Sequence, residues 1–123
     1  HQQIDQSLSG KAVQLKPNYA KVQLHTTHAM IADEKGLIHG GFAFSAADYA
    51  AMCAVNDPNV VLAKAQSTFT APVKLGQTIV FEANVLSNNG KKQTVDVHGY
   101  VGDTVVFKGL FTTAVLKKHI FEL

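Results

Sequence analysis

Residues 36–56 read GLIHGGFAFSAADYAAMCAVN, and the expected fold follows from this segment. From residue 41 to 56 it is rich in alanine, which favours helix, and Asp48 is its only charged side chain. A helix that is apolar on nearly every side is expected to be buried on nearly every side. Asp57 and Pro58 follow, and proline cannot continue a helix. The stretch therefore predicts one long buried helix over about residues 41–56.

Both flanks of this helix carry the alternation of apolar and polar side chains that is typical of strands. Two short strands, around Val13 and around Val22, flank the turn at residues 16–19. After the helix, four strands follow one another through short turns, over residues 60–70, 78–87, 92–101 and 104–116. In the last of these we expect one face to carry Val105, Phe107, Phe111 and Val115.

Short turns between successive strands imply antiparallel neighbours. We therefore expect an α+β domain in which a five- to six-stranded antiparallel sheet wraps around one long central helix. A single domain fits residues 1–123, with residues 1–10 as a lead-in. Apolar side chains left on the sheet's edges favour dimerisation through a shared sheet.

Composition narrows the classes of function. Hydrophobic residues make up 46% of the chain and charged residues 16%, as in a folded domain. All 11 cations are lysines, scattered along the chain, so we expect no nucleic-acid partner. No apolar run is long enough for a membrane span and none resembles a signal peptide. The single cysteine, Cys53, cannot form an internal disulfide, and we expect it to be an inert core thiol. The cytoplasm is therefore the expected location.

Gly40 and Gly41 precede the helix directly. A helix start offers backbone N–H groups without partners, and glycine lets a ligand approach them. Such groups suit a carbonyl oxygen that becomes negative during acyl transfer. The alternative is that the two glycines only make a tight turn. His39, just before them, either hydrogen-bonds to the backbone and positions the loop or contacts substrate.

Asp48 is the second candidate, because a buried carboxylate is costly without a partner. At 3.6 residues per turn it shares one helical stripe with Gly41, Ser45 and Met52. Burial would raise its pKa, which suits a general base. Alternatively, Ser45 or a neighbouring chain satisfies it. Phe42 and Met52 either line an apolar tunnel for substrate or belong to the core. We expect no metal site and no cofactor.

The segments 36–41 and 44–48 resemble the hotdog-fold thioesterases of the phenylacetate-pathway (PaaI-like) type. That family carries a His-Gly-Gly motif followed by an acid nine positions after its histidine, as Asp48 follows His39. Residues 69–77, FTAPVKLGQ, resemble the family's Phe-x-x-Pro-Val-x-x-Gly turn. The similarity extends over about residues 12–116.

The resemblance implies a hotdog fold and a homodimer, which can pair further into a tetramer, with active sites at the dimer interface. The Gly41 N–H would polarise the thioester carbonyl beside Gly40. Asp48 of the opposing subunit would act as general base or nucleophile, and His39 would hold the loop. The substrate would be an acyl-CoA or acyl-carrier-protein thioester, so coenzyme A enters only as part of the substrate. Where the family typically has asparagine, this chain has Asp33, which adds a negative charge near the site.

Residues 95–111 resemble the end of the hotdog effector domain of a bacterial fatty-acid-synthesis repressor, which senses malonyl thioesters without hydrolysing them. Three functions follow from the two resemblances. The first is an acyl-CoA thioesterase. The second is a non-catalytic acyl-thioester sensor or carrier, and the third is a hotdog dehydratase, which usually needs a His–acid pair in the active site.

Overall fold

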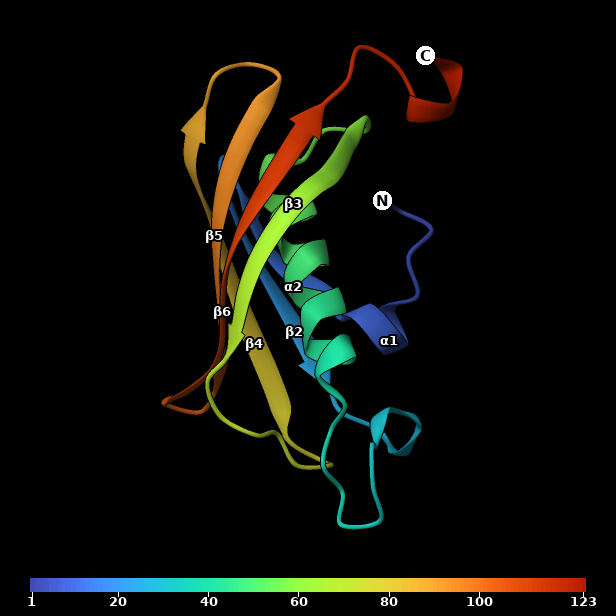
Figure 1. Cartoon of the computed structure of the whole chain (residues 1–123), viewed down its shortest axis with the longest axis vertical. Helices are drawn as coiled ribbons and strands as arrows, with labels where there is room; N and C mark the ends of the chain where they lie inside the picture. Colours follow the sequence, from blue (N-terminus) through green and yellow to red (C-terminus); the bar gives the residue numbers. More distant parts are fainter.

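The computed structural model describes all 123 residues and contains one long helix on a six-stranded sheet (Figure 1). The helices are α1 (Gln6–Ser9), η1 (His28–Met30), α2 (Gly40–Val55) and η2 (Ile120–Glu122). The strands are β1 (Lys11–Lys16), β2 (Tyr19–His25), β3 (Val60–Phe69), β4 (Thr78–Asn88), β5 (Lys92–Val101) and β6 (Thr104–Val115). The sheet order is β1-β2-β4-β5-β6-β3, and every neighbouring pair is antiparallel. The expected α+β hotdog architecture is confirmed.

The α2 helix lies against the concave face of the curved sheet (Figure 1), mainly on β2, β4 and β5. It begins after His39 and ends at Asn56, which takes the left-handed conformation with φ 53°. Asparagine tolerates that conformation, and the Asp57 carboxylate then accepts a hydrogen bond from the Asn59 N–H. The helix thus occupies nearly the predicted residues. It is too short to cross a membrane, and so is every other helix.

The core forms where the inward side chains of the sheet meet the alanines of α2. Its largest buried side chains include Phe81, Phe107 and Phe111. The prediction that Val105 shares the inward face of β6 was wrong. The register between β5 and β6 shifts at Gly99 and Tyr100, so that the pairing skips Val106, which is 4% exposed. This bulge turns Val106 toward the core and leaves Val105 half-buried.

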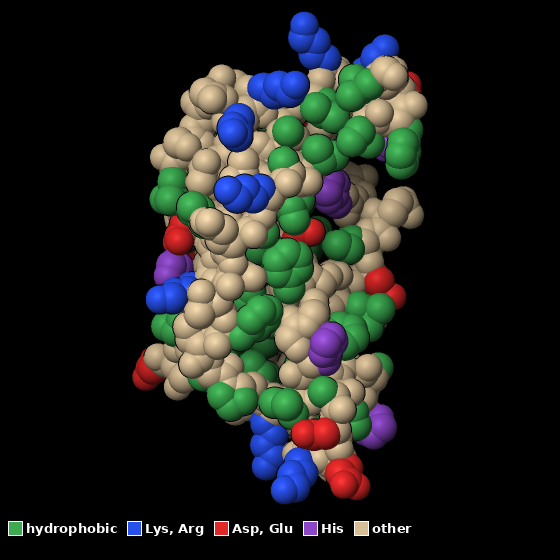
Figure 2. Space-filling view, in the orientation of Figure 1, with side chains coloured by type: hydrophobic (Ala, Val, Ile, Leu, Met, Phe, Trp, Pro, Cys, Tyr) green, Lys and Arg blue, Asp and Glu red, His purple; other side chains and the backbone are tan.

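One side of α2 stays open in the single chain. Its small residues are buried, but a group along the same helix is only half-buried, namely Phe44, Ser45, Asp48, Tyr49 and Cys53. Beside it, β3 is an edge strand whose side chains are mostly exposed after Leu62. Figure 2 shows hydrophobic side chains gathered on this face. The expectation that α2 is buried on nearly every side therefore does not hold within one chain.

Candidate active site

The start of α2 presents two backbone amides without acceptors. The His39 N–H donates to Met30 O at 2.9 Å, and the Phe42 N–H donates to His39 O at 3.1 Å. The amides of Gly40 and Gly41, which lie between them, donate to no acceptor in the structure. Together with the positive end of a 16-residue helix, they form a site for a partly negative oxygen.

Neighbouring side chains leave little room for a Cβ at these two positions. A Cβ on Gly41 would lie 3.0 Å from the His39 ring, and a Cβ on Gly40 would lie 3.2 Å from the Phe69 ring. The His39 side chain makes no capping hydrogen bond. It packs instead over Gly41, with its ring centroid 6.1 Å from that of Phe42. His39 therefore borders the helix start by contact rather than by capping.

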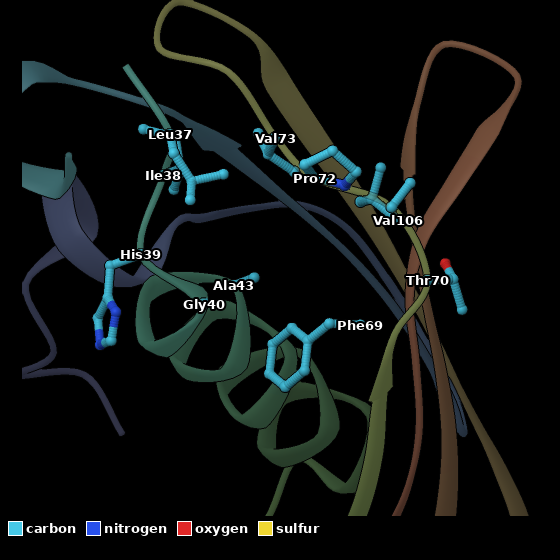
Figure 3. A pocket seen from close by; sticks show the side chains of 11 residues that line it. Leu37, Ile38, His39, Gly40, Ala43, Phe69, Thr70, Pro72, Val73 and Val106 are labelled. Atoms are coloured by element: carbon cyan, nitrogen blue, oxygen red, sulfur yellow. The ribbon is translucent and has the colours of Figure 1, made fainter. Parts of the chain in front are cut away.

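An apolar cavity of about 320 Å³ opens beside this helix start (Figure 3). Backbone bonds bring the loop after β3 to it: the Ile38 N–H donates to Val73 O at 2.9 Å, and Leu37 forms a β-bridge with Lys74. The cavity is lined by residues 37–40, Ala43, residues 69–73 and Val106. Sequence reasoning assigned only His39 and Gly40 of these to a site. Its one signal for the others was the motif at residues 69–77.

Asp48 lies half-buried on α2, and its Oδ1 has no hydrogen-bond partner. Ser45, the expected intrachain partner, shares a hydrogen bond of 2.6 Å with the Ser9 hydroxyl instead. Burial, unrelieved by a donor, raises the pKa of Asp48 from 3.8 to about 6. A carboxylate with this pKa is well suited to accept a proton near neutral pH.

Asp48 and the glycine amides do not meet within one chain. At 1.5 Å per residue, the seven positions from Gly41 to Asp48 separate them by about 10 Å along the helix. A thioester carbonyl held by Gly41 is therefore out of reach of the same chain's Asp48. Met52 lies about 16 Å along the helix from Gly41 and lines a separate hollow of about 650 Å³ with Tyr49.

The sequence model of the thioesterase superfamily matches residues 35–108, which include His39, both glycines and Asp48. The chain belongs to the thioesterase superfamily. The match extends from the loop before α2 to the middle of β6 and so includes all of the cavity lining.

Relatives of this thioesterase-superfamily chain carry different names. It is 53% identical over 116 residues to methylthioribose-1-phosphate isomerase of Aquifex aeolicus, which covers 94% of this chain and 25% of that protein. It is 31% identical over 108 residues to transcription factor FapR of Staphylococcus aureus, covering 87% of this chain and 58% of FapR. The chain thus spans a quarter of the first relative and just over half of the second.

Solved structures share the fold. Uncharacterized protein PH1136 from Pyrococcus horikoshii has a TM-score of 0.97 at 48% identity, covering 98% of this chain and 93% of that one. The PaaI protein of Escherichia coli has a TM-score of 0.84 at 20% identity, covering 93% and 84%. A hypothetical thioesterase from Streptococcus pneumoniae, solved with coenzyme A, has a TM-score of 0.80 at 15% identity. The match covers 89% of this chain and 87% of that one. The last two likenesses concern the fold alone.

Asp33 lies in the exposed loop that leads to α2. Its Oδ1 accepts hydrogen bonds from the Lys35 N–H at 2.9 Å and the Leu37 N–H at 3.1 Å. An asparagine oxygen can accept the same two bonds. In this superfamily member Asp33 therefore shapes the loop before His39, and it does not line the cavity.

Proposed function

We propose that this protein hydrolyses acyl thioesters, of coenzyme A or of an acyl carrier protein, with Asp48 as the catalytic acid–base or nucleophile. One observation carries the proposal: Asp48 is a half-buried carboxylate with an unpartnered oxygen and a pKa raised to about 6. Burying such a group costs stability, and the chain gains nothing structural in return. Membership of the thioesterase superfamily supports the same conclusion.

The glycine amides supply the other half of the reaction. The thioester oxygen would accept hydrogen bonds from the Gly40 and Gly41 N–H groups, which strengthen as the oxygen becomes negative. In the general-base form, Asp48 takes a proton from water while the water oxygen attacks the carbonyl carbon. The carbon–sulfur bond then breaks, the acid is released, and the leaving thiolate takes up the proton. No cofactor is required, since coenzyme A is part of the substrate.

A homodimer would bring these two halves together. Within one chain they are about 10 Å apart along the helix, and the open side of α2 lies next to the edge strand β3. Pairing β3 with its copy would continue the sheet and cover that side of the helix. We therefore propose that Asp48 of one subunit serves the glycine amides of its partner.

Release of free thiol from a panel of acyl-CoA thioesters tests the proposal. The wild-type protein should turn over at least one of them, and Asp48→Ala should abolish turnover while leaving the oligomeric state unchanged. Asp103→Asn removes a carboxylate from an exposed turn and is the matched control. Full activity of Asp48→Ala would remove Asp48 from the mechanism.

The second candidate is a non-catalytic acyl-thioester sensor or carrier. The observation that favours it is the 31% identity to transcription factor FapR over 108 residues. Tight binding of acyl-CoA without turnover of any member of the panel would establish this function in place of hydrolysis.

A further inference from the structure

The cavity beside the helix start has an unusual lining for a site next to two free amides. No lysine, aspartate or glutamate borders it, and the chain contains no arginine at all. Of its polar side chains, the Thr70 hydroxyl donates to Val105 O at 2.6 Å. Figure 3 shows His39 directed away from the apolar group formed by Val73, Pro72 and Val106. Away from the helix start, the lining therefore offers no charged side chain that could pair with a carboxylate or an ammonium group.

We propose that this cavity takes the acyl chain of the substrate, that it accepts a compact uncharged chain, and that Phe69 is the wall that limits chain length. The proposal rests on the proposed function only for the identity of the ligand as an acyl thioester. A carbonyl held by the Gly40 and Gly41 amides would place its hydrocarbon in the adjoining apolar space. A dicarboxylic acyl group such as malonyl would bury an unpaired charge there, at a large cost.

The cavity volume gives the expected chain length to an order of magnitude. At 320 Å³ it lies at the small end of ligand sites, which span about 300–1,000 Å³. If each carbon takes about the 30 Å³ of a water molecule, the space holds roughly ten non-hydrogen atoms. This includes the thioester carbonyl at its mouth, so we expect chains of about eight carbons to fill it.

Phe69 is suited to be the limiting wall. It ends the edge strand β3, and its ring lies 3.2 Å from the position of a Gly40 Cβ. The ring packs edge-on against buried Phe107 at 5.4 Å between centroids, yet Phe69 remains 53% exposed. Because Phe69 is not part of the buried core cluster, removing the ring should enlarge the cavity without collapsing the core.

Binding of S-alkyl-CoA thioethers, which cannot be hydrolysed, tests the proposal independently of Asp48. For the wild-type protein, calorimetry should give an affinity that rises about fourfold per methylene and stops rising near eight carbons. Phe69→Ala should raise this chain-length limit by about four to six carbons, which is the size of the ring that the substitution removes. Phe121→Ala, at a position 91% exposed and outside the cavity, is the matched control.

Two further measurements keep the test decisive if Phe69→Ala is unstable. Ala71→Leu, on the loop that lines the cavity, should shorten the limit by about three carbons. S-(3-carboxypropyl)-CoA should bind at least about tenfold more weakly than S-butyl-CoA. An unchanged limit in both cavity variants, or equal binding of the carboxylated analogue, would overturn the proposal. Hydrolysis in the thiol assay could still be intact, so the two proposals fail separately.

Discussion

Replacing Asp48 with asparagine should stabilise the protein at neutral pH while it removes hydrolysis. Burial raises the pKa of Asp48 from 3.8 to about 6, so the folded state disfavours the charged form. At 1.36 kcal/mol per pKa unit this difference corresponds to about 3 kcal/mol. Water reaches the half-buried carboxylate, which reduces the expected gain to about 1–2 kcal/mol.

The sign of the effect depends on pH. Below pH 3.8 the carboxyl is neutral in both folded and unfolded states, so wild type and Asp48→Asn should be about equally stable. Between pH 3.8 and about 6 the unfolded state loses this proton while the folded state keeps it, so wild type loses stability relative to the variant, and above about 6 the difference stays constant. Urea unfolding of both proteins at a series of pH values from 4 to 8 measures the difference.

The reasoning would be refuted if the difference in unfolding free energy between Asp48→Asn and wild type did not grow between pH 4 and 8. Equal pH dependence in wild type and Asp48→Asn would mean that the folded protein provides Asp48 with a donor or with free access to water. Asp103→Asn, at an exposed turn position, is again the control. If the stability difference between Asp103→Asn and wild type also grew with pH, the cause would be the change in net charge rather than the burial of Asp48.

Three other outcomes are expected. The kcat/KM of wild type should rise with pH and level off above about 6, because only ionised Asp48 accepts a proton, and a profile flat from pH 5 to 8 would contradict this. Gly41→Ala should lower hydrolysis by about tenfold or more, since its Cβ lies 3.0 Å from the His39 ring at the amide; an active variant would place the carbonyl elsewhere. Ser45→Ala should cost about 1 kcal/mol in urea unfolding by removing the 2.6 Å bond to Ser9, and a double-mutant cycle with Ser9→Ala should show that the two losses are not additive.

The architecture could be predicted from the sequence because an element with one buried face carries apolar residues at its own structural period, which is two residues in a strand. The alternation of Ile79, Phe81 and Ala83 marks the inward face of β4, and all three are buried. The error at Val105 has a local cause. The bulge that turns Val106 inward is a change in backbone register, and an extra apolar residue in an apolar run does not reveal it.

The site was predictable only in part, since its pieces are distant in sequence. The glycines and Asp48 stand on one helix, so spacing and resemblance identified them, although their catalytic roles stay predictions. The cavity wall at Phe69 comes from the end of an edge strand and reaches Gly40 only through the tertiary fold. Ser45 hydrogen-bonds to Ser9 rather than to Asp48, whose Oδ1 is left without a hydrogen-bond partner. This pairing depends on where α1 packs in the folded chain.

We propose that each active site takes its amides from one subunit and its acid from the other. Mixing Asp48→Ala protein with Gly41→Val protein, each inactive alone, shows whether the site is shared between subunits. In a two-fold dimer every mixed pair would contain one intact site, so unfolding and refolding an equal mixture should restore about a quarter of wild-type thiol release. Background activity in a mixture shown by native mass spectrometry to contain the mixed dimer would contradict the claim.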